Sequence, residues 1–194
     1  MPTALTAEER TEFYVKIKSQ LATAQLATRA YSEVTRHLEA VLDNVVELQR
    51  HMDDPDGAAH DVDAELVAEV RDAVTNMLGT VADVSAHAYR AEEQLGSLFQ
   101  RVLTGSVKHP QAIHDVAVDA LKALSTGQLN AERTLRNDLS TPWDALFDAA
   151  HAATEVSPHV VSVVEDGTFH LDKMRVVLYA IPEVLGTLDW DFPQ

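Results

Sequence analysis

The sequence contains no cysteine and little glycine, proline or aromatic material. Its 194 residues include 7 Gly and 7 Pro, and aromatic residues make up 6%. Without cysteine the chain has neither disulfides nor thiolate metal ligands, which fits a reducing compartment. It also lacks the G-x-S-x-G motif and the glycine-rich loops that bind phosphates. We therefore expect no nucleophilic or nucleotide-dependent catalysis, and we favour a protein that is not an enzyme.

Positive charge is scarce as well. Lys and Arg together number 15 against 31 Asp and Glu, so the net charge is −16. The basic residues are scattered, whereas binding to nucleic-acid phosphates needs them clustered. The longest apolar run, 176–181, is too short to span a bilayer, and Glu8 and Glu9 stand where a signal peptide would be basic and then apolar. We expect a soluble, cytoplasmic protein that binds neither nucleic acid nor membranes.

One stretch carries the strongest pattern in the chain. Between residues 67 and 102, apolar residues recur alternately three and four positions apart without interruption. A mean spacing of 3.5 keeps side chains on one stripe of an α-helix, so the pattern predicts a long helix packed lengthwise on another helix. The stripe consists of Val67, Val70, Val74, Met77, Val81, Val84, Ala88, Ala91, Leu95, Leu98 and Val102.

The preceding fifty residues predict a second long helix. No Gly or Pro lies between Pro2 and Pro55, and Thr6 with Glu9 forms a capping box at the start. We assign its core stripe to Tyr14, Ile17, Leu21, Ala24, Thr28, Tyr31, Thr35, Leu38, Leu42, Val45, Gln49 and Met52. A second apolar line follows beside it, consisting of Phe13, Ala27, Val34, Val41 and Leu48. Because the loop between the two helices is short, they should form an antiparallel hairpin.

The remaining chain predicts shorter helices. One should begin at Pro110 and present Ile113, Ala117, Leu121, Leu124, Ala131 and Leu135. Residues 125–127 leave open whether this helix is continuous or split in two. Another should begin at residues 140–142. Residues 160–171 fit two structures, a β-hairpin around Asp166-Gly167 and a helix, and we slightly prefer the helix. A last helix should end at Pro182.

These elements together predict an all-α fold. The expected architecture is an elongated helical bundle built on the long antiparallel hairpin, with a small C-terminal β-hairpin as the alternative for residues 160–171. Residues 1–156 would form the bundle, and residues 157–194 a C-terminal cap packed on it.

The turn after the first long helix is rich in carboxylates. Its residues Asp54, Asp56, Gly57 and Asp63 occupy the third, fifth, sixth and twelfth places of a calcium-binding EF-hand loop. Met52, however, stands at the first ligand place, and Asp63 replaces the long bidentate Glu. A solvated acidic turn, in which Asp61 or Asp63 caps the next helix, explains the same residues, so Asp54, Asp56 and Asp63 are only a weak candidate metal site.

Three acid–histidine pairs have i,i+4 spacing, which places both side chains on one helix face. They are Glu33/His37, Glu47/His51 and Asp83/His87. A di-iron bundle needs Glu-x-x-His motifs on two helices, and the chain has none. In our register Glu33 and His37 fall at outer positions. Glu47 and His51 remain a second candidate metal site, with surface ion pairs as the simpler interpretation.

From these observations we expect an interaction or scaffold protein that acts through long helical faces. Its partner would be another protein or a second copy of the chain, so we expect a homo-oligomer. No cofactor is expected, and a metal ion is the only one that the residues would support. Two alternatives belong to other classes: a metal-binding helical bundle, and an acidic mimic of nucleic acid that occupies a basic protein.

Overall fold

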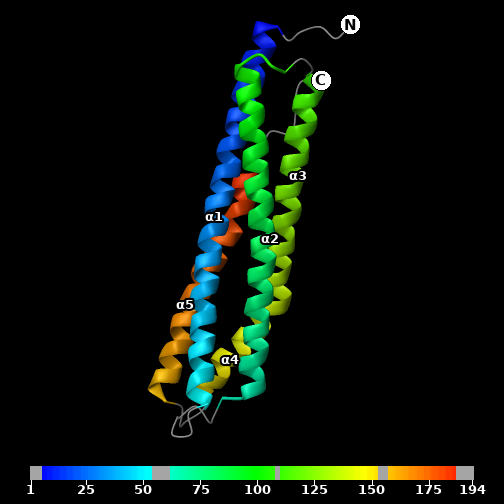
Figure 1. Cartoon of the computed structure of the whole chain (residues 1–194). Coiled ribbons are helices and arrows are strands. Elements are labelled where there is room, and N and C mark those ends of the chain that lie inside the picture. Colours follow the sequence, from blue (N-terminus) through cyan, green and yellow to red (C-terminus); the bar gives the residue numbers. More distant parts are fainter. Residues whose placement is uncertain (1–5, 54–61, 108–109, 153–156, 187–194) are drawn as a thin grey trace. The chain divides into compact units, whose positions relative to one another are not determined.

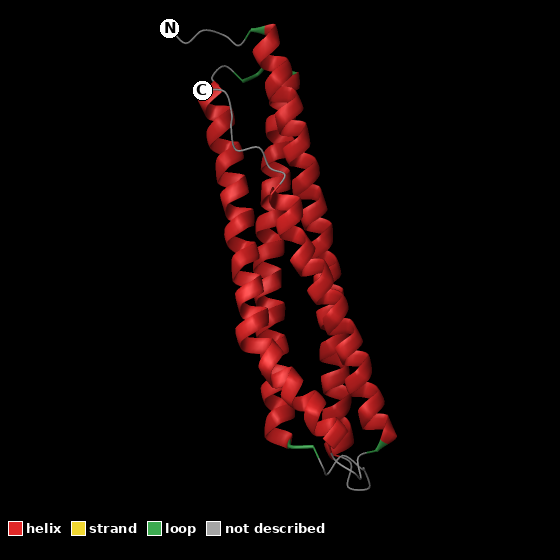
Figure 2. Cartoon of the chain, turned by 180° about the vertical axis from the view of Figure 1, so that it is seen from behind, coloured by secondary structure: helices red, strands yellow, loops and turns green. Residues whose placement is uncertain are grey.

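The structure is a computed structural model that describes residues 6–53, 62–107, 110–152 and 157–186. All of its elements in those ranges are helices (Figures 1 and 2). They are α1 (Ala7–Asp53), α2 (Ala64–Leu103), α3 (Pro110–Thr134), the π-helix η1 (Leu135–Leu139), α4 (Ser140–Ala152) and α5 (Pro158–Gly186). The predicted all-α class is confirmed. Among the helices of the described ranges, none combines the length and apolar character needed to cross a bilayer.

The chain divides into two compact units, which are described separately. Unit 1 comprises residues 1–31, 83–129 and 180–194, and unit 2 comprises residues 32–82 and 130–179. Helices α1, α2, α3 and α5 each contribute a segment to both units. Within each unit the α1 and α2 segments lie side by side and run in opposite directions (Figure 1). The proposed division at residue 156 stays a prediction.

The predicted stripe of α2 forms the core side of that helix. All eleven of its residues are buried, and none is more than 4% exposed. Val67 to Val81 lie in unit 2, and Val84 to Val102 lie in unit 1. Each fully buried Val or Leu side chain contributes about 1.5–3 kcal/mol, so this stripe is a main source of stability in both units.

About half of the residues that we assigned to the core stripe of α1 are not part of the buried stripe. The buried line has the same alternating spacing but combines the predicted second line with every other residue of the predicted first. Positions 14, 21, 28, 35, 42 and 49, which we assigned to the core, are only partly buried. Thr and Gln occupy three of those positions. Their polar groups stay partly hydrated at the edge of the contact, so the free-energy cost of burying them is smaller there. The buried line is Phe13, Ile17, Gln20, Ala24, Ala27, Tyr31, Val34, Leu38, Val41, Val45 and Leu48.

Both long helices begin with the caps that the sequence predicts. Thr6 donates its backbone N–H to Oε2 of Glu9 (2.7 Å), and Glu9 donates its own to Oγ1 of Thr6 (3.2 Å). These hydrogen bonds to Thr6 lower the pKa of Glu9. At the end of α2, Gly105 has φ +67°, and Ser106 N–H donates to the carbonyl of Arg101. That pattern is a Schellman motif, which favours glycine.

In unit 1, α3 is continuous at residues 125–127, where the sequence left a split open. Gly127 lies inside the helix, and a methyl group there would stand 2.9 Å from Cγ1 of Val84 on α2. The glycine therefore permits close helix packing and does not end the helix. At the next residue of α3, Oε1 of Gln128 accepts a hydrogen bond from the hydroxyl of Tyr31 on α1 (2.7 Å), which satisfies two polar groups in the core.

In unit 2, α3 passes into α4 through η1 without a new helix start. The buried residues follow one another at four-residue steps, at positions 131, 135, 139 and 143. In a regular α-helix of 3.6 residues per turn, such steps would rotate these side chains away from the core. A π-turn absorbs the extra residue. It also lies directly before Pro142, whose ring would clash with the carbonyl four residues earlier in a regular helix. The first residue of α4, Ser140, therefore agrees with the expected start at residues 140–142, but the chain enters it from η1 and not through a separate helix N-terminus.

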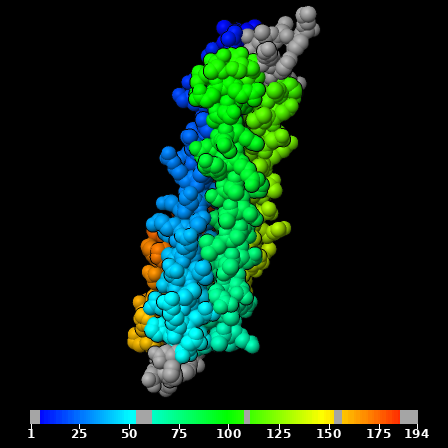
Figure 3. Space-filling model, in the orientation of Figure 1, coloured from blue at the N-terminus to red at the C-terminus, as the bar shows by residue number. Residues whose placement is uncertain are grey.

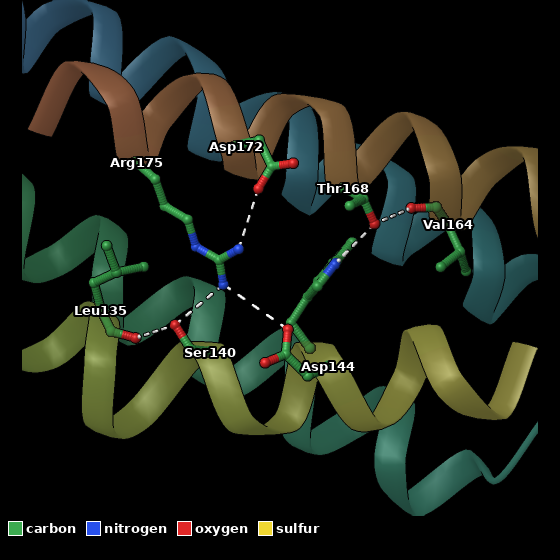
Figure 4. A network of polar contacts seen from close by, with 8 residues as sticks. Leu135, Ser140, Asp144, Val164, Thr168, Asp172 and Arg175 are labelled. Carbon is green, nitrogen blue, oxygen red and sulfur yellow. Dashed lines mark hydrogen bonds and ion pairs between the residues drawn. The ribbon is translucent and has the colours of Figure 1, made fainter.

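A polar network joins this junction to α5 (Figure 4). Ser140 donates its hydroxyl to the carbonyl of Leu135 (3.0 Å) and accepts a hydrogen bond from Nη2 of Arg175 (3.2 Å). The same guanidinium bonds Asp172 (3.1 Å) and lies 3.9 Å from a carboxylate oxygen of Asp144. Arg175 thereby ties η1 and α4 to α5.

Residues 160–171 are helical, so the alternative β-hairpin does not form. Asp166-Gly167, the expected turn, lies within α5, and Gly167 packs against Trp143 of α4. The indole Nε1 donates to Oγ1 of Thr168 (3.1 Å). Pro182 does not end the helix either, since α5 continues to Gly186. A proline within a helix removes one hydrogen bond and produces a kink, and four more residues follow here.

The Gly167 contact predicts a large asymmetry between two glycine substitutions. A methyl group on Gly167 would stand 2.5 Å from Cη2 of Trp143, whereas one on Gly79 meets nothing within 4 Å. We expect Gly167→Ala to lower the free energy of unfolding by about 1–3 kcal/mol through overpacking. Gly79→Ala, the matched control, should raise it by about 0.5–1 kcal/mol. Urea titrations of both variants measure this, and equal effects would contradict the assigned contact.

Candidate metal centre

Three potential metal ligands meet in unit 2 where the end of α1 lies beside the start of α5. Glu47 and His51 are four residues apart on α1 and therefore share one face. His159 lies in the first turn of α5, where its backbone N–H donates to the hydroxyl of Ser157 (3.3 Å). This cap fixes the start of α5. Figure 3 shows the two segments side by side, with α1 in cyan and α5 in orange.

The three side chains point toward one another. Oε1 of Glu47 lies 3.0 Å from Nε2 of His159 and 3.8 Å from Nε2 of His51. The two imidazole rings meet edge to face, with centroids 4.3 Å apart. One ligand atom from each residue lies within 4.8 Å of the other two. In the described part of the chain, this is the only such group of three or more His, Asp or Glu side chains.

These distances suit a single metal ion. With bonds of about 2.0–2.1 Å, neighbouring ligand atoms stand about 3.3 Å apart in a tetrahedral site and about 2.9 Å apart in an octahedral one. The 3.0 Å and 3.8 Å separations lie on either side of the tetrahedral value. Small side-chain rotations would therefore bring all three atoms to bonding distance without moving the helices.

The site is open to solvent. The side chains of Glu47, His51 and His159 are 46%, 37% and 50% exposed. An ion can enter directly, and three protein ligands leave at least one coordination position for water. The net charge of −16 also raises the local concentration of cations. Chemically, the arrangement can hold a divalent ion together with an exchangeable water.

The acidic loop does not contribute to this group. Asp54 and Asp56 lie outside the described residues. Asp63 caps α2, since its Oδ1 accepts a hydrogen bond from the backbone N–H of Glu65 (2.9 Å). That role matches the cap that the sequence predicts at this position.

The two other acid–histidine pairs have different outcomes. Asp83 and His87 are exposed on α2. We expected Glu33 and His37 at outer positions, and for His37 this was wrong. His37 is only 9% exposed and lies against His170 of α5. The shift follows from the corrected register of α1, which moves Val34 and Val41 into the core, because residue 37 is three and four residues from them and shares their face.

His159 is the ligand that sequence reasoning missed. It lies 112 residues beyond Glu47 and belongs to no local motif. The only signal in the sequence was that His159 lies in the first turn of a helix capped by Ser157. The packing of α5 on α1 is what brings this side chain to Glu47 and His51. Glu47 and His51 were found because their spacing alone places them together.

Comparisons with family models, with curated proteins and with solved structures find no match to this chain. The functional argument therefore rests on the geometry of the described residues.

The cap at Asp63 gives a prediction that separates its structural role from metal binding. Asn caps a helix as well as Asp does, but it lacks the negative charge with which a carboxylate attracts a metal ion. We expect Asp63→Ala to lower the free energy of unfolding by about 1 kcal/mol and Asp63→Asn to leave it nearly unchanged. Urea titration without added metal measures both values. An equal loss in the two variants would show that the carboxylate charge matters and not the cap.

Proposed function

We propose that this protein binds one divalent transition-metal ion through Glu47, His51 and His159. The observation that supports this function is the convergence of three donor atoms from two helices within 4.8 Å of one another. The ion would join α1 to α5, two segments that are more than a hundred residues apart in sequence. Cross-linking such distant segments stabilises a fold, because it restricts the unfolded chain and because the ligand binds only the folded form.

The ligand set indicates the class of metal. Two imidazole nitrogens and one carboxylate suit Zn²⁺, Ni²⁺, Co²⁺ and Cu²⁺, whereas Ca²⁺ and Mg²⁺ prefer oxygen ligands. Zn²⁺ in particular is bound by two His and one Glu in several sites that keep a water ligand. We therefore assign the site to the borderline transition metals and take Zn²⁺ as the probe.

Calorimetric titration of the whole protein with Zn²⁺ tests this function. We expect one ion per chain, and we expect His51→Ala and His159→Ala each to weaken binding at least about tenfold, since even outer partners of ligands have effects of that size. His87→Ala, which removes an exposed histidine of α2, is the matched control and should bind as the parent protein does. Zn²⁺ at about 100 times its Kd should stabilise the parent protein by about 2.7 kcal/mol.

Two outcomes of the Zn²⁺ titration would contradict the proposed metal binding. Binding of Zn²⁺ that is unchanged in both His51→Ala and His159→Ala would locate the ion elsewhere, and absence of stoichiometric binding would remove the function. Ca²⁺ serves as a second probe in the same titration. Saturable Ca²⁺ binding that survives in His159→Ala would instead favour the acidic loop.

A separate observation supports self-association, the interaction role that the sequence predicts. Three large apolar side chains on α5, Phe169, Val176 and Tyr179, are 54%, 70% and 45% exposed. Their spacing of seven and three places them on one face of the helix. Residues 168–182 carry one acidic residue and two basic ones, so repulsion between two copies of this acidic chain is weakest there. We propose that a second copy of the chain covers this face.

Sedimentation equilibrium tests the contact between copies. We expect the double variant Phe169→Ser/Val176→Ser to shift the protein toward monomer by at least about tenfold in the dissociation constant, because each buried apolar side chain contributes about 1.5–3 kcal/mol. Val15→Ser changes an equally exposed residue of α1 (60%) and should have no effect. A parent protein that is monomeric at millimolar concentration would contradict the proposal.

A further inference from the structure

A second polar contact joins α1 to α5 in unit 2, apart from the candidate metal centre. Nδ1 of His37 lies 3.0 Å from Nδ1 of His170, and the ring centroids are 5.3 Å apart. His37 is 9% exposed, and the side chain of His170 is 25% exposed. Two nitrogens at this distance share one proton in a hydrogen bond, so one ring must donate and the other must accept.

The neighbouring charges fix which ring donates. Nη2 of Arg36 lies 3.4 Å from Nε2 of His37, and a guanidinium can only donate. Nε2 of His37 therefore carries the lone pair, and in the neutral ring the proton resides on Nδ1. His37 then donates to Nδ1 of His170, whose own proton must be on Nε2. That nitrogen faces Oδ2 of Asp166 at 3.8 Å.

The contacts thus form a directed chain from Arg36 through His37 and His170 to Asp166. Asn44 of α1 completes it by donating Nδ2–H to Oδ2 of the same Asp166 (3.0 Å). Each donor in the chain faces an acceptor, provided that both imidazoles are neutral. The arrangement crosses from α1 to α5 twice, at His37–His170 and at Asn44–Asp166.

We propose that the His37–His170 pair is an acid-sensitive clasp between α1 and α5. A proton added to Nε2 of His37 would point an N–H at the guanidinium of Arg36. A proton added to Nδ1 of His170 would oppose the N–H of His37 at 3.0 Å. Every added proton therefore costs a hydrogen bond or brings two donors face to face, and acid opens the contact.

The charged groups around His37 decide the pH range. Burial lowers the pKa of His37 most, Arg36, His170 and Lys173 lower it further, and Glu33 alone raises it. The unfolded chain therefore takes up this proton more readily than the folded one. The stabilisation is complete above the unfolded pKa of about 6.5 and is lost as the pH falls from there toward the lowered pKa of the folded protein.

Opening of the clasp would expose apolar surface on α5. Leu171 follows His170 directly, and Leu171 and Met174 are fully buried in unit 2. Loosening this helix turn would bring both side chains toward water. None of the residues of the clasp belongs to the group of Glu47, His51 and His159, so the clasp can be tested in the metal-free protein.

NMR of the imidazole nitrogens tests the assignment in the whole protein with a chelator present. We expect His37 to carry its proton on Nδ1 and His170 on Nε2 at about pH 7.5, and we expect the His37 ring to remain neutral below about pH 6.5, where free histidine is half protonated. A proton on Nε2 of His37 at neutral pH would overturn the proposal.

Hydrogen exchange tests the consequence. Asn can place an amide donor or an acceptor oxygen close to the position of imidazole Nδ1, so His37→Asn/His170→Asn keeps a hydrogen bond and removes the titration. We expect amide protection of residues 168–176 to fall at least about threefold more in the parent protein than in this double variant between about pH 7.5 and 5.5. His87→Asn, the control, should respond as the parent does. An equal acid response in parent and double variant would also overturn the clasp.

Discussion

The alternation of three- and four-residue steps between buried side chains is the constraint on which this structure depends. It governs α1, α2 and α5 alike, since buried residues of α5 follow the same steps from Val160 through Gly167 to Leu185. A helix that keeps this spacing presents the same stripe along its whole length. Polar residues beside the stripe are then also repeated every seven residues, so polar contacts between two such helices recur at fixed intervals.

The contact between α1 and α5 in unit 2 shows this consequence. His37, Asn44 and His51 are spaced by seven on α1, and they contact His170, Asp166 and His159 in turn. These three polar contacts lie about 10 Å apart along α1, at 1.5 Å per residue. The candidate metal centre and the histidine pair are therefore two positions of one repeating pattern, and both follow from the packing of α5 on α1.

The sequence predicted the helices well where one pattern stood alone. The α2 stripe was complete, and the caps at Thr6 and Asp63 were correct. In α1, two apolar lines one residue apart competed, and only the neighbouring helices decide which line is buried. The D-G pair at residues 166–167 kept a β-hairpin open beside the preferred helix, because the decisive partner, Trp143, lies 24 residues earlier in the chain. The open question at Gly127 and the wrong end at Pro182 have a related cause, since packing can override a local helix breaker.

The same distinction explains the candidate site. Glu47 and His51 could be found from spacing on one helix, but His159 and His170 gain their roles only when α5 lies against α1. Since both polar sites act on this pair of helices, their ligands are linked in thermodynamic terms. A metal ion at Glu47, His51 and His159 would favour the state in which α5 is packed on α1, and protonation of His37 would favour its release. Such coupling is reciprocal, so an ion that holds α5 in place would also lower the proton affinity of His37.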